Sequence, residues 1–546
     1  MASNGSSLNH VNNNFNSFHQ LPDTRKAMLE LNTIKTTDSH QDTKWQYTGN
    51  RDDFYNSSAS DVTHDQEYTE EEKLLVKKID WFIMPIICTL DFLQFLDKST
   101  INYAALMTFK TDVHLEGNQF SLLGSVFYLG YFLFQLPNNF LLQRISVGKY
   151  IGIIVVLWGT VLLCTAFGTN FSQIAAMRFL LGFFEAGIYP SLTLLVSTFY
   201  RRSEQVARLG AFWICNGFAL FAGGLVSFGI SHMVNVGGLK SWQWYVEFTF
   251  DKKFLEINYF VYPDRIMIIL GSITILMGVV SFFFLIDSPK SSALKLNAEQ
   301  EMLVEERTRD NATVRTTEVK TEHIWEAIKE IRFWCFSFAC LLINLQNGAM
   351  TIYNGQITAS FGFDQVESML LSAGSGAATI LFIAVAIVSV QRTHQTIYTA
   401  CALMVVNVLG LILLLAIPVT HLKLIGFYMS WSYCSVYVLL VTSISNNVTG
   451  YTKKIFYNGV LMIFYTVGNF VGPLMMVSPP YIEGMIGYLI ANSLVLILLL
   501  IARSRMALVN KRRILLLAHT SASSAAHSYC QDDISDEQDQ TFIYLL

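Results

Sequence analysis

The chain has 546 residues, of which 52% are hydrophobic and only 14% are charged. This composition predicts a polytopic membrane protein rather than a set of soluble domains. The formal net charge of −4 indicates no basic surface for nucleic acid, and the eight cysteines show neither a disulfide framework nor a metal-ligand spacing. No nucleic-acid partner and no cofactor are therefore expected.

Residues 1–75 form a polar N-terminal tail rich in Asn, Ser, Thr, Asp and His. Such a segment buries too little apolar surface to offset its chain entropy, so we expect a disordered cytoplasmic tail. Residues 70–78, which overlap the end of this tail, have the charge pattern of a short amphipathic helix on the membrane surface, and a solvated charged face is the alternative.

The rest of the chain divides into apolar segments of membrane-spanning length, six on each side of a charged stretch. We predict an all-α membrane protein with an N-terminal bundle (76–287), a cytoplasmic central loop (288–331), a C-terminal bundle (332–503) and a cytoplasmic C-terminal tail (504–546). The twelve predicted spans are 80–103, 119–142, 150–168, 172–197, 208–232, 266–287, 333–353, 367–390, 396–417, 422–445, 455–477 and 481–502.

Positive residues indicate the orientation of these spans. Connections on the side of the tails carry Arg144, Lys149, Arg201, Arg202, Arg208, Arg392, Lys453 and Lys454, whereas the opposite connections are poorer in Lys and Arg, except for one long loop. The positive-inside bias then predicts that both termini are cytoplasmic.

Charged residues inside the apolar spans are the strongest functional signal. Arg178 and Glu185 lie seven residues apart in the fourth span, on one helix face but too far apart for a direct salt bridge. Lys98 and Asp97 lie at a similar depth in the first span, and Asp91 is on the same face as Lys98. We interpret Arg178 as the holder of an anion and Glu185 as the carrier of a proton in one cavity, with Asp91 as a second titratable candidate. The alternatives are a structural ion network for Arg178 and Glu185, an interfacial ion pair for Asp97 and Lys98, and a bond to a polar residue of a neighbouring helix for Asp91.

Several longer stretches resemble the major facilitator superfamily, and within it the anion:cation symporter family of the fungal allantoate permease type. The stretches that carry this resemblance are 95–104, 178–190 continuing to 199–208, 446–454 and 468–473. The resemblance covers roughly residues 75 to 505. It implies the major facilitator fold of two six-helix bundles, with Asp97 and Glu185 as protonatable groups and with Lys98 and Arg178 as substrate cations.

The chain departs from the family in two places. The family most often has arginine where this chain has Lys98, and lysine is a point charge rather than a planar fork, which leaves Arg178 as the main bidentate anchor. Residues 245–266 look like an insertion before the sixth helix, either a loop on the outer face or an artefact of the gene model.

Each of the remaining candidate functional residues also has a purely structural interpretation. Arg201, Arg202, Glu204 and Arg208 resemble a charged gate between helices, or they are positive-inside residues. Asn344, Asn347, Tyr353 and Trp431 are candidate substrate-binding residues of the second half, although amides equally join helices to one another.

Together these features predict a proton-coupled symporter rather than an enzyme. It would import a small organic or sulfur-containing anion, such as a carboxylate, sulfonate, sulfate ester, ureide or vitamin acid, as a lipid-embedded monomer of the plasma membrane, by alternating access of its two halves. The alternative is a nutrient sensor with the same fold that transports nothing, and an uptake measurement distinguishes the two.

Overall fold

The computed structural model describes residues 69–546 apart from 107–108, 166, 232–264, 288, 290, 292–293, 298, 305–319 and 520–533. The expected disordered tail thus lies outside the described residues, except for its last part, and so does nearly all of the apparent insertion 245–266. The described chain is helical throughout its apolar segments, as the sequence predicts for an all-α membrane protein.

The N-terminal half is built from α3 to α10. Its helices are α3 (Glu70–Leu106), α4 (Phe109–Asp112), α5 (Gln119–Arg144), α6 (Val147–Thr165), α7 (Phe171–Glu185), α8 (Ile188–Phe199), α9 (Arg202–Ser231) and α10 (Arg265–Phe284). Helix α3 already begins at Glu70, so the amphipathic segment 70–78 continues directly into the first predicted span.

The C-terminal half follows the short helix α12 (Thr321–Lys329). Its elements are α13 (Ile331–Ser360), α14 (Gln365–Thr393), α15 (Thr396–Ala416), α16 (Thr420–Met429), η6 (Ser430–Ser432), α17 (Tyr433–Asn447), α18 (Tyr451–Leu474) and α19 (Ile482–His519). Helix α19 extends well past the boundary predicted at residue 503, because the helical pattern continues through the basic residues that follow the apolar segment.

Ten helical segments of the described residues are long and apolar enough to cross a membrane. They correspond to ten of the twelve predicted spans, with α7 and α8 together forming one of them, Phe171–Val196. The remaining two predicted spans are the helices α5 and α10, and the apolar part of α10 is the shorter segment Leu270–Phe284.

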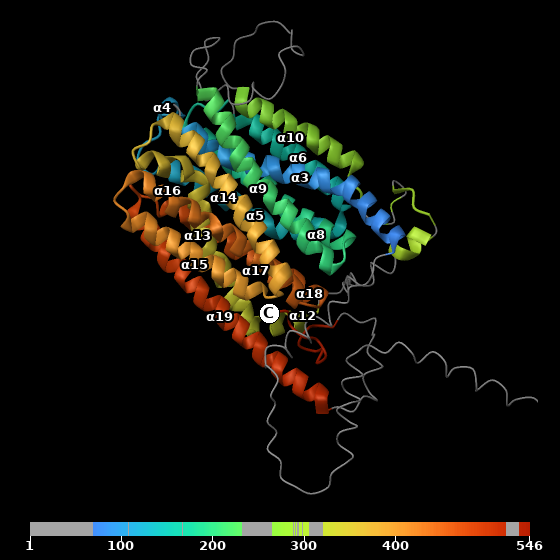
Figure 1. Cartoon of the computed structure of the whole chain (residues 1–546). Helices are drawn as coiled ribbons and strands as arrows, with labels where there is room; N and C mark the ends of the chain where they lie inside the picture. The colour runs from blue at the N-terminus through green and yellow to red at the C-terminus, as the bar shows by residue number, and fades with distance from the viewer. Residues whose placement is uncertain are drawn as a thin grey trace, which may run out of the picture. The chain divides into compact units, whose positions relative to one another are not determined.

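The two halves pack through equivalent helices. Helix α9 lies against α14, α5 lies against α18, and α3 contacts α13. The helices α6 and α10 form a lateral pair in the N-terminal half (Figure 1), as α15 and α19 do in the C-terminal half. Helices α5 and α14 are the second spans of their halves, and α9 and α18 are the fifth spans. Each of the two main contacts therefore joins the second span of one half to the fifth span of the other, which gives an approximate two-fold arrangement.

Glycines set the closest of these approaches. A Cβ atom added to Gly159 of α6 would lie 2.9 Å from the carbonyl oxygen of Gly271 in α10. Likewise, a Cβ on Gly182 of α7 would lie 1.9 Å from the carbonyl oxygen of Phe127 in α5. Small residues let backbones approach where the hydrophobic effect does not drive helices together.

We call the end of the bundle where α3 begins and α19 finishes the tail end, and the opposite end the far end. Among the described residues, hydrogen bonds between the halves lie toward the far end: Ser121 with Tyr353 (2.6 Å), Lys110 Nζ with Gln356 (2.7 Å), the Gly355 amide with Asn102 (3.0 Å) and the Ser125 hydroxyl with the Phe470 carbonyl (2.8 Å). The described conformation is therefore closed at the far end.

Candidate functional site

A cavity of about 50 Å³ lies between the two halves. Helix α3 contributes Asp91, Gln94 and Lys98 to its wall, and residues of the C-terminal half face them. The other polar and aromatic lining residues are Phe95, Tyr131, Tyr189, Trp213, Asn216, Asn344, Asn347, Thr379, Tyr433, Cys434, Tyr437 and Tyr465. The cavity thus joins a charged wall to a neutral polar and aromatic one.

The spacing of the α3 residues explains the charged wall. Asp91, Gln94 and Lys98 are separated by three and four positions, so they lie on one helix face. Asp91 is almost fully buried, and within the described chain its Oδ2 atom has no hydrogen-bond partner. A buried carboxylate oxygen without a partner favours the protonated form or a bound ligand that donates to it.

Lys98 and Glu185 form an ion pair across this wall. The Lys98 Nζ atom lies 2.7 Å from Glu185 Oε1, and the exposed fractions of the two side chains are 12% and 0%. The ammonium group also lies 5.8 Å and 5.9 Å from the ring centroids of Phe127 and Tyr131, within the range of cation–π attraction. Of the two partners only Lys98 lines the cavity, so Glu185 neutralises it from behind.

Asp97 and Arg178 form a second layer of charge. Asp97 is adjacent to Lys98 but points about 100° away on the helix, and its Oδ2 atom accepts a hydrogen bond of 3.0 Å from the Trp158 indole. Arg178 is 5% exposed, and its positive charge acts on the Asp97 carboxylate. Neither residue is among the described residues that line the cavity, so Arg178 is not placed to contact a ligand in this conformation.

The position of Glu185 follows from a break in the fourth span. Helix α7 ends at Glu185 and α8 begins at Ile188. Pro190 lacks an N–H group and therefore cannot bond the Ala186 carbonyl four residues earlier, and the Gln135 amide of α5 approaches that oxygen at 3.5 Å instead. The carboxylate thus lies at a discontinuity in the middle of the span, where transporters often place coupling groups.

The amides of the C-terminal half form a connected network. Asn347 donates to Asn469 (2.8 Å), Asn469 donates to Asn344 (3.0 Å), and Tyr433 donates to Asn347 (3.1 Å). Asn344 and Asn347 therefore both line the cavity and join helices, so the two roles expected from the sequence coincide in them.

Two other candidates lie outside the cavity wall. Tyr353 bonds Ser121 and packs edge-to-face against Phe120 at the far end, 5.4 Å between ring centroids. Trp431 is fully buried behind Tyr433, at 5.8 Å between ring centroids. In this conformation Tyr353 ties the halves together, whereas Trp431 supports a lining residue.

A row of aromatic rings forms a part of the cavity wall that was not predicted from the sequence. Tyr189, Trp213, Tyr437, Tyr465 and Tyr131 follow one another across both halves, with successive ring centroids 5.6, 5.2, 5.8 and 6.2 Å apart. Aromatic residues are common in every span, so only their spatial convergence distinguishes these five.

The charged residues proposed as a gate lie at the tail end of the N-terminal half. Arg201 Nη1 lies 3.0 Å from Glu72, and Arg208 Nη2 lies 3.0 Å from Asp80. Arg201 therefore ties the turn between α8 and α9 to α3, and Arg208 ties α9 itself to α3. Glu204 accepts a 3.2 Å hydrogen bond from the Arg201 amide. Arg202 begins α9, and its side chain lies outside the described residues. Glu72 and Asp80 were not singled out from the sequence, because carboxylates near a membrane surface are usually solvated.

Comparison with known proteins identifies the family. The model of the Major Facilitator Superfamily matches residues 87–473. The chain is 29% identical over 453 residues to the thiamine pathway transporter THI73 of Saccharomyces cerevisiae, covering 82% of this chain and 81% of the relative. It is 25% identical over 494 residues to the allantoate permease of the same yeast, with 87% of each chain covered.

Solved structures support the same fold. An inward-facing, occupied structure of a bacterial homologue of the human lysosomal transporter Spinster matches with a TM-score of 0.53 and 12% identity, covering 78% of this chain and 96% of that one. The nucleoside transporter NupG matches with a TM-score of 0.52 and 11% identity, covering 77% and 99%. Because the family model matches more than half of this chain, the chain belongs to the major facilitator superfamily and is a membrane transporter of that fold.

Proposed function

We propose that this transporter is a proton-coupled symporter that imports a small organic or sulfur-containing anion. The proposal places it in the anion:cation symporter family of the allantoate permease type, as a monomer in the plasma membrane with both termini in the cytoplasm. Its similarity to the allantoate permease of yeast supports an anionic substrate. The positive residues on the tail side support the orientation.

The observation that carries the proposal is the Lys98–Glu185 ion pair beside the cavity. A buried cation needs a counter-charge, because an isolated charge in a low-dielectric site is strongly destabilised. Lys98 can take this counter-charge either from Glu185 or from a substrate anion. If Glu185 binds a proton, Lys98 becomes free for the anion, so proton and anion are bound together.

This exchange explains coupled transport in terms of charge. With neither ligand, the pair Lys98–Glu185 is neutral; with both, the anion neutralises Lys98 and the proton neutralises Glu185. A state with only one ligand leaves an uncompensated buried charge and is penalised when the halves rock. Asp91, in the same wall, is the second candidate for the proton, and Asp97 is the third through its interaction with Arg178.

The remaining wall would set the orientation of the anion. Asn344, Asn347 and Tyr433 are donors or acceptors that bind polar groups without the desolvation cost of a further charge. The tail-end pairs Arg201–Glu72 and Arg208–Asp80 would act as gating contacts that fix the N-terminal half while the other end opens.

Replacement of Glu185 by Gln tests the coupling. Glutamine keeps the size of the side chain but cannot carry a dissociable proton, so we expect loss of proton-driven accumulation with counterflow exchange largely retained. Glu483→Gln, an exposed carboxylate at the start of α19, is the matched control and should accumulate substrate like the wild type.

Accumulation against a gradient by Glu185→Gln would refute the coupling role. Uptake is measured after a growth screen on single nitrogen, sulfur and vitamin sources has identified the anion. A protein that binds a ligand but accumulates none would instead be the nutrient sensor.

A further inference from the structure

The C-terminal residues 534–546 fold back onto the tail end of the C-terminal half. The Leu545 amide donates to Asn447 (2.7 Å), and the Asn447 side chain donates to the Leu545 carbonyl (2.9 Å). The Tyr544 carbonyl and amide bond the side chain of Asn510 (2.8 and 2.9 Å), and the Thr396 amide donates to Leu546 (2.9 Å). We call this segment the strap, since it joins the ends of α15, α17 and α19.

Asp536 is the anchor of the strap. Its side chain is fully buried, with Oδ1 2.9 Å from Lys453 Nζ and Oδ2 paired with Arg332 and 2.7 Å from the Tyr544 hydroxyl. Burial alone would raise the pKa of Asp536, but Arg332 and Lys453 outweigh burial and hold this pKa below its usual range. The ionised carboxylate therefore stabilises the docked strap, and this contribution is lost only in strong acid.

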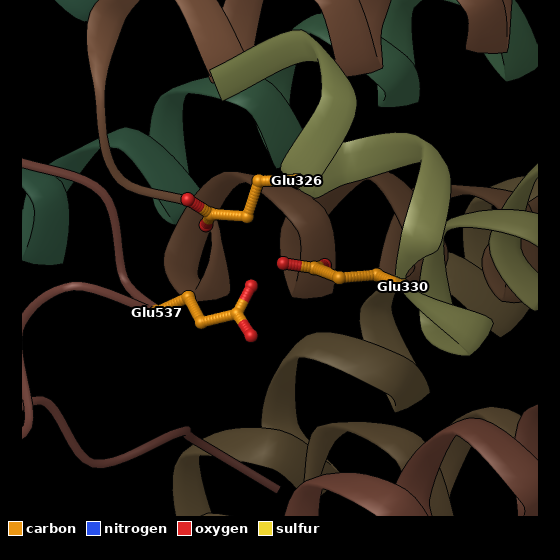
Figure 2. Close-up of side chains that lie close together, drawn as sticks. All are labelled: Glu326, Glu330 and Glu537. Carbon is orange, nitrogen blue, oxygen red and sulfur yellow. The ribbon is translucent and has the colours of Figure 1, made fainter. Parts of the chain in front are cut away.

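Glu537, the next residue, has the opposite effect. Figure 2 shows its carboxylate facing those of Glu326 and Glu330, and one oxygen from each of the three carboxylates lies within 4.8 Å of the other two. Partial burial and these two neighbours raise the pKa of Glu537, although Lys453 counteracts them. Charged Glu537 therefore weakens docking, and this weakening grows as pH rises through its raised pKa.

The charges of the cluster also balance without the strap. Glu326 and Glu330 pair with Lys453, and Glu330 pairs with Arg332, so two carboxylates face two cations. Docking adds the carboxylates of Asp536 and Glu537, while Arg513 of α19 donates to the main-chain carbonyls of Asp536 and Phe542. Negative charge then still exceeds positive charge by one among these side chains, and Glu326, Glu330, Lys453 and Arg332 stay paired with one another when the strap departs. A metal ion is not needed at the three glutamates, because Lys453 already supplies a cation at 2.5 Å from Glu326.

We propose that residues 534–546 are a reversible strap that Asp536 holds and Glu537 opposes, and that the docked strap slows transport by clamping the turn between α17 and α18. Besides Asn447, this turn is held at Thr449, whose amide and hydroxyl contact Asp536 and Ile534 at 3.4 Å. The docking is independent of the proposed function, whereas the effect on transport rests on it.

Two adjacent substitutions with the same change of charge test the docking. In the purified full-length chain, hydrogen–deuterium exchange of residues 534–546 is compared for the wild type, Asp536→Asn and Glu537→Gln. Asp536→Asn should accelerate exchange about tenfold or more, because charge-assisted bonds are lost. Glu537→Gln should slow it. Asp539→Asn, whose carboxylate accepts only from Thr541 of the strap among the described residues, should change little.

Equal exchange in wild type and Asp536→Asn, or acceleration by both Asp536→Asn and Glu537→Gln, would overturn the docking. The initial rate of anion uptake then tests the clamp: Asp536→Asn should raise it and Glu537→Gln should lower it. Unchanged uptake rates despite altered exchange would overturn the effect on transport alone. Absence of anion uptake by the wild type would contradict the proposed function, while the exchange result would still decide whether the strap docks.

Discussion

At the scale of single residues, the site depends on which of two buried cations reaches the cavity. Lys98 lines the wall and approaches Glu185 at 2.7 Å, whereas Arg178 lies behind it near Asp97. Because charges inside apolar spans are rare, the sequence alone indicated that both cations belong to one functional site. It could not show which cation reaches the cavity, because Lys98 lies on α3 and Arg178 on α7, and the rotation of each helix about its axis is set by tertiary packing.

Replacement of Lys98 tests this order. Lys98→Met keeps the aliphatic length but removes the charge, so we expect uptake to fall by roughly 100-fold or more, since a buried Glu185 then lacks its partner. Lys98→Arg should retain part of the uptake, because it restores the positive charge with a different geometry. The measurement is the initial rate of anion uptake at matched amounts of protein in the membrane.

Arg178 provides a separate residue-scale prediction. Arg178→Lys keeps a positive charge near Asp97, but the guanidinium fork is lost. If Arg178 contacts the anion in another conformation, the substrate concentration for half-maximal uptake should rise at least about tenfold. An unchanged half-saturation concentration with a reduced maximal rate would instead assign Arg178 to the support of Asp97.

At the scale of elements, close contact between α5 and α7 positions Glu185 of α7 and the Phe127 ring of α5, which faces Lys98. A Cβ atom on Gly182 would lie 1.9 Å from the Phe127 carbonyl oxygen, and one on Gly130 would lie 2.0 Å from that of Phe179. The two glycines therefore allow the backbones to touch at two points, one on each helix. Phe127, whose ring faces Lys98, is part of the same contact.

Gly182→Ala should consequently force the helices apart. We expect a loss of about 1–3 kcal/mol in folding free energy, as for other overpacked sites, together with lower uptake. Thermal unfolding of the purified protein measures the first effect. Ala176→Leu, on an exposed position of the same helix, is the control and should unfold like the wild type; a stable Gly182→Ala would show that α5 and α7 can separate at no cost.

At the scale of the whole molecule, the membrane spans and the fold class were predictable from the sequence, whereas the contacts between distant segments were not. Apolar segments of membrane-spanning length indicated the spans, and two six-helix halves followed from the number of these segments. The aromatic row from Tyr131 to Trp213 and the strap at 534–546 depend instead on contacts between residues far apart in the chain. The segment 534–546 was predicted to belong to a cytoplasmic tail, because the cations that pair with its anchor Asp536 come from the distant helices α13 and α18.

The contact between the halves at the far end leads to the last prediction. Lys110 Nζ lies 2.7 Å from Gln356 and 4.4 Å from the Phe120 ring centroid, so residues 110 and 356 meet across the interface when the far end is closed. If the halves alternate between two open states, this contact must break in every cycle. In a double variant with Lys110→Cys and Gln356→Cys, a short bifunctional thiol reagent that cross-links the two new cysteines should therefore abolish uptake.

The two single-cysteine variants, treated with the same reagent, control for modification of the native cysteines and should keep most of their uptake. Release of the cross-link by a cleavable reagent should restore transport in the double variant. Sustained uptake by fully cross-linked protein would mean that the far end need not open. The anion would then have to cross by a route that leaves residues 110 and 356 in contact, and a rocking motion of the two halves about the central cavity would be ruled out.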